Sequence, residues 1–331
     1  MSMASRSVAM TPQAYVREQS RWHPLEIAFW LATLLPFVIF PDYLSLASQI
    51  AVAALFALSL DLILGYAGIV SLGHAAFFGT GAYAAGIFSK FVWGEPFTGL
   101  IVGAAAAALL GYATSFIISR FRHLTLIMIT LGLGLLLHEA ANSAGWLTGG
   151  SDGFQGISIW PMLGLFKFGL FGTTQYAYSL CVLFIVFLGA RRLINSPFGL
   201  ALRGIRENWV RMPAIGASSR AHIRKIYTIS AAIAGTAGAV IAQTTQTVSL
   251  EALSFERSAD VLVMLVLGGA GRLYGGLIGA TIFMIARDQF SGIAPQYWYF
   301  WIGLLLVAVV MVLPNGILGG LSQFYARWRG R

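Results

Sequence analysis

Charged side chains are scarce in this sequence: Asp, Glu, Lys and Arg make up 10% of the 331 residues, against 58% hydrophobic residues. A soluble globular domain carries about 25% charged residues. Too few polar side chains therefore remain to cover a water-facing surface. This shortage excludes an ordinary soluble domain and indicates that lipid surrounds most of the chain.

Cysteine and lysine are also rare. The single cysteine, Cys181, rules out an intrachain disulfide, and its apolar neighbours predict a small buried hydrophobe. None of the three lysines (Lys90, Lys167 and Lys225) follows a glycine, so the chain has no Gly-Lys-Ser/Thr phosphate loop. No apolar run carries paired carboxylates or histidine clusters at metal-ligand spacing. We therefore expect no bound cofactor or metal, no catalytic residues and no enzymatic activity in this chain.

Long apolar runs, by contrast, are abundant. A membrane-spanning helix needs roughly 20 mostly apolar residues, and backbone polar groups in lipid must be paired within helices or closed barrels. The runs here are continuous rather than alternating, which favours helices. We predict an all-α, polytopic transmembrane bundle of about ten spans: 25–40, 44–64, 75–92, 97–120, 124–142, 175–192, 223–246, 257–270, 274–290 and 296–314.

The basic residues predict the orientation of this bundle. With the N-terminus inside, seventeen of the 21 lysines and arginines fall on the cytoplasmic side, and only Lys90, Lys167, Arg257 and Arg287 fall outside. The positive-inside rule then places both termini in the cytoplasm. The net charge of +9 therefore reflects topology, and we expect no nucleic-acid partner.

Three parts follow from this topology. Residues 1–24 form a cytoplasmic N-terminal segment, and 25–40 is interpreted as a retained span because no signal-peptide cleavage site follows it. Residues 25–320 form the transmembrane domain, with an extracytoplasmic loop at 143–173 and a cytoplasmic segment at 191–225. Residues 321–331 form a basic cytoplasmic tail.

The cytoplasmic segment contains a predicted amphipathic helix. Asn195-Ser196-Pro197 combines a capping side chain with a proline at the first helical position. Large apolar residues then recur on one helical face: Phe198, Leu202, Ile205 and Trp209. The remaining surface carries Arg203, Arg206 and Glu207, and Pro213 should end the helix shortly before Gly216. Such a helix either lies on lipid headgroups or presents its apolar side to a groove on a cytoplasmic partner.

A glycine-rich segment follows the second predicted span. Its small residues could let helices approach closely, as at Gly79, or could permit an unwound turn at Gly65, Gly68 and Gly73. The candidate residues for a translocation path or for helix packing are Gly65, Tyr66, Gly68, Ser71, Gly73, His74, Phe77, Gly79, Gly81 and Tyr83.

Several ionisable groups lie in or beside predicted spans, where they are costly and often functional. His74 either relays protons or contacts solute, or it forms a hydrogen bond to a neighbouring helix, which is the simpler interpretation. Asp61 lies one turn before the glycines, with Arg272 as its candidate partner. The phrase Gly-x-Ala-Gly occurs at both 65–68 and 268–271, which is either a trace of an internal repeat or a coincidence.

Three stretches together resemble LivM-type permeases of branched-chain amino acid ABC transporters, over about 44–320. Residues 65–83 contain every fixed position of Gly-Tyr-x-Gly-x-x-Ser-Leu-Gly-His-Ala-x-Phe-x-Gly-x-Gly-Ala-Tyr. Residues 196–207 resemble the family's coupling-loop signature, and 267–276 resemble a later glycine-rich stretch. The chain departs from the family at Arg211-Met212-Pro213, where two small residues are usual, which bears on the exit of the coupling helix and on ATPase choice.

The resemblance implies a permease subunit of an ATP-driven importer in the bacterial inner membrane, for branched-chain amino acids or related small solutes. It implies four kinds of partner: two cytoplasmic ATPase subunits that hold the ATP, a second LivH-like permease, a periplasmic solute-binding protein, and lipid. The implied ATPase-coupling residues are Phe198, Leu202, Arg203, Ile205, Arg206, Glu207, Trp209 and Gly216. The alternative is an autonomous secondary transporter or channel, for which Asp61, His74 and Glu139 are few ionisable groups.

Overall fold

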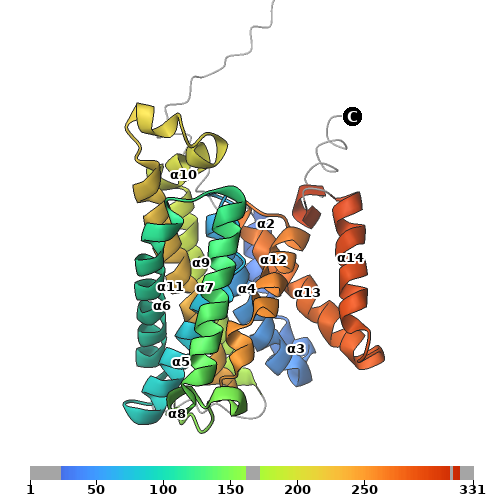
Figure 1. The fold of residues 1–331 in the computed structure, drawn as a ribbon. Helices are drawn as coiled ribbons and strands as arrows, with labels where there is room; N and C mark the ends of the chain where they lie inside the picture. Colours follow the sequence, from blue (N-terminus) through green and yellow to red (C-terminus); the bar gives the residue numbers. More distant parts are fainter. Residues whose placement is uncertain (1–23, 162–171, 314–315, 321–331) are drawn as a thin grey trace, which may run out of the picture.

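The computed structural model describes residues 24–161, 172–313 and 316–320. Most of these residues lie in helices, and the described ranges contain one isolated antiparallel bridge, between Phe154 and Val248. The α-helices (Figure 1) are α2 (Pro24–Ala32), α3 (Pro36–Ile39), α4 (Leu44–Leu64), α5 (Ala75–Phe91), α6 (Pro96–Ile118), α7 (His123–Ser143), α8 (Gly145–Thr148), α9 (Thr173–Ile194), α10 (Pro197–Glu207), α11 (Ser219–Thr245), α12 (Phe255–Gly268), α13 (Leu273–Ile293) and α14 (Trp298–Val312). Four 3₁₀ turns connect them: η1 (Pro41–Tyr43), η2 (Gly150–Asp152), η3 (Met212–Ile215) and η4 (Leu250–Leu253).

Six of the described helices are long and apolar enough to cross a membrane, and the number rises to seven if a bent pair is counted as one span. The helices α4, α6, α7, α9 and α11 meet this test, and the sixth candidate is the longer stretch that begins with α14 at Trp298, so the prediction of an all-helical, multi-spanning bundle is confirmed. The remaining predicted spans are helical but shorter or broken. Residues 25–40 divide into α2 and α3, α5 has 17 residues, and α12 and α13 meet at an angle of 114°.

Glycines bring α5, α6 and α11 into close contact. A methyl group on Gly81 would lie 2.6 Å from the carbonyl carbon of Gly235, and one on Gly103 would lie 2.7 Å from the carbonyl oxygen of Gly81. Both distances are too short for a real side chain, so the three backbones can pack this closely only because these residues are glycine.

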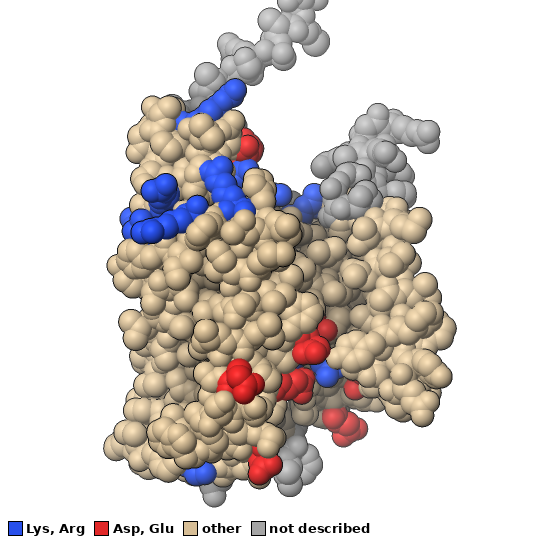
Figure 2. Space-filling view, in the orientation of Figure 1, with Lys and Arg blue, Asp and Glu red and all other residues tan. Residues whose placement is uncertain are grey.

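Basic and acidic residues are separated along the bundle. Lys and Arg gather at the end that carries α10, whereas most Asp and Glu on the same face lie in the opposite half (Figure 2). The predicted segment 1–23, the tail 321–331 and part of the loop at 143–173 lie outside the described residues. On α9, Cys181 is exposed, so the prediction that it is buried is wrong; a helix in lipid can expose an apolar side chain outward.

Candidate coupling site at the α10 end

The α10 helix begins where the sequence predicts and ends earlier. Ser196 is its N-cap, with the hydroxyl accepting a hydrogen bond from the Gly199 N–H at 3.5 Å, and proline occupies the first helical position. The helix ends at Glu207 because Asn208 is extended and its side-chain oxygen accepts the next two free backbone N–H groups. Pro213 therefore does not end the helix, and Trp209 lies beyond it, contrary to prediction.

The apolar side of α10 faces the chain's own bundle. Leu202 and Ile205 are 0% and 2% exposed, and α10 packs against α9 and α11. Phe198 is half-buried and stacks on the His222 ring, with centroids 5.4 Å apart. The prediction that this side fits a groove on a partner is therefore wrong for Leu202 and Ile205. Their burial anchors α10 to the bundle, so a partner could meet only its polar side.

Two of the predicted coupling residues, Trp209 and Gly216, lie after the helix. Trp209 is half-buried beneath the Arg122 guanidinium, whose central carbon is 3.8 Å from the ring centroid. Gly216 ends η3 with a φ of +89°, a backbone conformation that favours glycine. Both residues shape the return of the chain into α11.

On the polar side of α10, Arg206 is exposed but extends to the end of α4. Its guanidinium donates a hydrogen bond to the carbonyl oxygen of Gly65, directly after α4. One turn earlier, the Arg203 guanidinium lies 5.4 Å from the centroid of the Tyr66 ring. The short helix is thus attached to the glycine-rich segment by two arginines, while Glu207 beside them is exposed.

The end of α4 at Gly65 lies against the bend between α12 and α13. Asp61 is fully buried, and its carboxylate accepts a hydrogen bond from the Gly271 N–H at 2.7 Å. Arg206 is close enough to interact with the same carboxylate electrostatically. Asp61 is therefore hydrogen-bonded to Gly271, and the cation that acts on its carboxylate is Arg206, not the predicted partner Arg272.

The two Gly-x-Ala-Gly phrases are neighbours in space. A methyl group on Gly65 would lie 2.7 Å from the Cα of Gly271, and one on Gly271 would lie 3.1 Å from both the Gly65 oxygen and the Arg206 guanidinium. Gly271 has a φ of +81° and separates α12 from α13. The repeated phrase was the sequence signal for this contact, which we call the glycine junction: residues 61–68 and 268–271 together with Arg206.

Both suggested uses of the glycine-rich segment occur. Residues 65–74 are not helical, and Gly68 has a φ of +72°, so this part is an unwound turn. A methyl group on Gly73 would lie 2.7 Å from the carbonyl carbon of Thr130, so the turn also presses on α7. Gly79 and Gly81 lie in α5 and allow its close packing against η4 and α11.

The other candidates of this segment form the packed interior beside the turn. His74 is fully buried, its Nε2 atom is 2.8 Å from the Ser59 hydroxyl, and its ring stacks on Phe56 at 5.5 Å between centroids. This geometry confirms the simpler interpretation, a hydrogen bond to the neighbouring α4. Ser71, Phe77 and Tyr83 are likewise buried, with at most 5% of their surface exposed.

The described residues contain no group of three or more His, Cys, Asp or Glu side chains arranged to hold a metal ion. Their main feature is instead the attachment of a short amphipathic helix, α10, to the end of α4 beside the bend between α12 and α13. With six helices long and apolar enough to cross a membrane, this arrangement is that of a multi-pass membrane protein.

The comparisons with known proteins place the chain more narrowly. Residues 43–310 match the family of branched-chain amino acid transport system permease components, and the chain belongs to this family. The members of this family are transport subunits, and this chain is a permease component of a branched-chain amino acid ABC transport system, not an enzyme.

Among its relatives is the high-affinity branched-chain amino acid transport system permease protein LivM of Escherichia coli strain K12, 26% identical over 87% of this chain and 72% of that protein. The probable LivM protein of Methanocaldococcus jannaschii is 26% identical over 79% of this chain and 88% of its own. The LivH permease protein of Salmonella typhimurium is 25% identical over 80% and 91%. No solved structure matches the chain.

Proposed function

We propose that this chain is the LivM-like half of an ATP-driven importer that moves branched-chain amino acids or related small solutes into the cell. The observation that carries the proposal is the Arg206 contact, because it attaches an amphipathic surface helix to the broken ends of the spanning helices. A force applied to α10 would reach α4, α12 and α13 directly through the glycine junction.

In this proposal the polar side of α10 and the turn through Gly216 dock on two cytoplasmic ATPase subunits. The exposed Glu207 and the cation–π pair of Arg122 and Trp209 lie on the surface offered to them. When the ATPase subunits close, α10 moves with them. The glycine junction passes this movement to the spans, which alternate between outward and inward access. The chain itself binds no cofactor, and ATP is held by the partners.

The proposed orientation places α10 and both termini in the cytoplasm of a bacterial cell, with the chain in the inner membrane. The gathering of Lys and Arg at the α10 end supports this, since cytoplasmic loops carry the excess of basic residues (Figure 2). The ten predicted spans belong to the same proposal: α5 and the pairs α2–α3 and α12–α13 would enter the membrane besides the six longer helices.

We propose a LivH-like permease as the second half of the membrane unit. The similarity of this chain to LivH proteins as well as LivM proteins supports a pair of related subunits. A periplasmic solute-binding protein would deliver the solute to the face opposite α10. Autonomous transport is less well supported, because the buried groups Asp61 and His74 each hold one polar atom in a hydrogen bond within the bundle.

The test is reconstitution of this chain in vesicles, with and without the ATPase subunits, the second permease and the binding protein. Leucine uptake should require all of them and ATP. The variant Glu207→Ala should lower the amount of ATPase that co-purifies with the membrane subunits, whereas Glu139→Ala, an exposed acid away from α10, should not. Uptake by this chain alone would refute the proposal.

A further inference from the structure

A cavity of about 360 Å³ lies in the half of the bundle away from α10, between α4, α12, α13 and the end of α11. One wall is apolar and includes Val52, Phe56, Phe78, Val261 and Met264. The other wall carries charges of both signs: Glu251, Arg257, Arg287 and Asp288. Its size is in the range that holds a small-molecule ligand.

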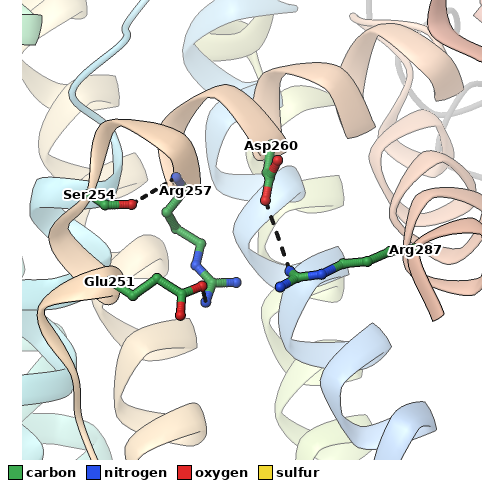
Figure 3. Close-up of polar contacts among 5 residues, drawn as sticks. All are labelled: Glu251, Ser254, Arg257, Asp260 and Arg287. Atoms are coloured by element: carbon green, nitrogen blue, oxygen red, sulfur yellow. Dashed lines mark hydrogen bonds and ion pairs between the residues drawn. The ribbon is translucent and has the colours of Figure 1, made fainter. Parts of the chain in front are cut away.

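Two ion pairs hold the arginines of the charged wall, and one of their acids, Asp260, lies behind the residues that line the cavity (Figure 3). Glu251 lies 3.1 Å from the Arg257 guanidinium, and Asp260 lies 4.0 Å from that of Arg287. The Ser254 hydroxyl caps the N-terminus of α12 by accepting a hydrogen bond from the Arg257 backbone N–H at 3.2 Å. This bond fixes the position of Arg257 in the first turn of the helix. The four residues come from η4, α12 and α13, so the cavity lies where these elements converge.

These ion pairs leave part of the hydrogen-bonding capacity of their arginines unused. The Nε atom of Arg257 is buried without a hydrogen-bond partner in the described part of the chain. The 4.0 Å separation between Asp260 and Arg287 is longer than a charged hydrogen bond, and their side chains are 14% and 31% exposed. The side chains of Arg257 and Glu251 are 27% and 59% exposed, and partly exposed ion pairs contribute little to stability. A purely structural role therefore accounts poorly for them.

We propose that this cavity is where the amino acid contacts this chain during transport. A branched-chain amino acid has one carboxylate, one ammonium group and an aliphatic side chain, and the cavity offers a complement to each. Arg257 binds the carboxylate, Glu251 and Asp288 bind the ammonium group, and the apolar wall receives the side chain. The charged groups of the solute replace existing ionic contacts between these side chains, so no charge is left without a counter-charge. This inference rests on the function proposed above.

The experiment uses the complete transporter in vesicles, with solute-loaded binding protein, and measures uptake of radiolabelled leucine and ATP hydrolysis in parallel. We expect Arg257→Gln to lower uptake at least tenfold while the complex stays assembled and hydrolyses ATP. Arg257→Lys should keep part of the uptake, since an ammonium group still attracts the carboxylate but cannot bind it in two places. The matched control is Lys90→Gln, a cation of the same half that is exposed and outside the cavity.

Two results would overturn the inference. One is wild-type uptake by Arg257→Gln. The other is full recovery of uptake when the charges are exchanged in the double variant Glu251→Arg, Arg257→Glu, because a pair that only bridges η4 and α12 works in either order. If the wild-type complex itself takes up no leucine, the proposed function fails instead, which keeps the two failures apart.

Discussion

The glycine junction can be tested by adding a single methyl group. Gly65 follows α4 with an ordinary helical φ of −70°, so alanine is allowed there by its backbone conformation. The substitution Gly65→Ala places a Cβ atom 2.7 Å from the Cα of Gly271 and against the Asp61 carboxylate. The effect therefore comes from contact across the junction alone.

The expected cost has two parts. Relieving the overlap requires the two backbones to separate, and overpacking of this kind costs about 1–3 kcal/mol. The separation also lengthens the 2.7 Å hydrogen bond from Gly271 to buried Asp61. Weakening a buried hydrogen bond to a charged group costs about 1.5–3 kcal/mol. The sum is roughly 2.5–6 kcal/mol, which for a chain of this size corresponds to a fall of about 4–9 °C in melting temperature.

The assay is thermal unfolding of the purified complex in detergent, followed by uptake and ATP hydrolysis in vesicles. The matched control is Gly132→Ala, since Gly132 is an exposed residue of α7 with no atom within 4 Å of an added methyl group. Gly65→Ala should melt lower and transport less leucine for each ATP hydrolysed, and Gly132→Ala should do neither. Equal melting temperatures and equal uptake for both variants would refute the close approach of Gly65 and Gly271.

Three further predictions use the same assays. Arg206→Ala should leave ATP hydrolysis largely intact but lower uptake about tenfold, because a charged hydrogen bond contributes about 1.5 kcal/mol. Unchanged uptake would show that this hydrogen bond does not couple α10 to the spanning helices. Gly81→Ala should melt several degrees lower because it pushes α5 from α11, whereas Gly189→Ala meets nothing within 4 Å and should not. Ser59→Ala should destabilise the complex by about 1–3 kcal/mol by leaving the buried His74 ring without its partner, and an unaltered melting curve would contradict this contact.

Helix positions could be predicted from sequence because their cause is local. A continuous apolar run must pair its backbone groups within itself when lipid surrounds it, and α4 lies at 44–64 as predicted. The prediction was weaker where neighbouring helices decide the outcome. The 114° bend between α12 and α13 depends on the close approach of Gly268 to α13 and of Gly271 to Gly65 and Arg206, and no run of hydrophobic residues records such contacts.

The candidate site illustrates the same limit. The periodicity of α10 correctly located its apolar side, but periodicity cannot distinguish a side that faces a partner from one that faces the chain's own bundle. Leu202 and Ile205 face inward. Likewise, the sequence places Arg206 on the surface offered to a partner. In the structure its guanidinium forms a hydrogen bond with Gly65, which is 141 positions away. Contacts of this range depend on the whole packing.

The same three helices serve both proposed sites. Towards α10, α4 contributes Asp61 to the glycine junction, and α12 and α13 meet there at Gly271. In the other half, the same helices carry Val52, Arg257 and Arg287 into the cavity. A helix is stiff along its axis, so a tilt imposed at one end moves the other. Transport requires ATP hydrolysis outside the membrane to change the solute's surroundings within it, and these helices provide a connection short enough to do so without an intermediate element.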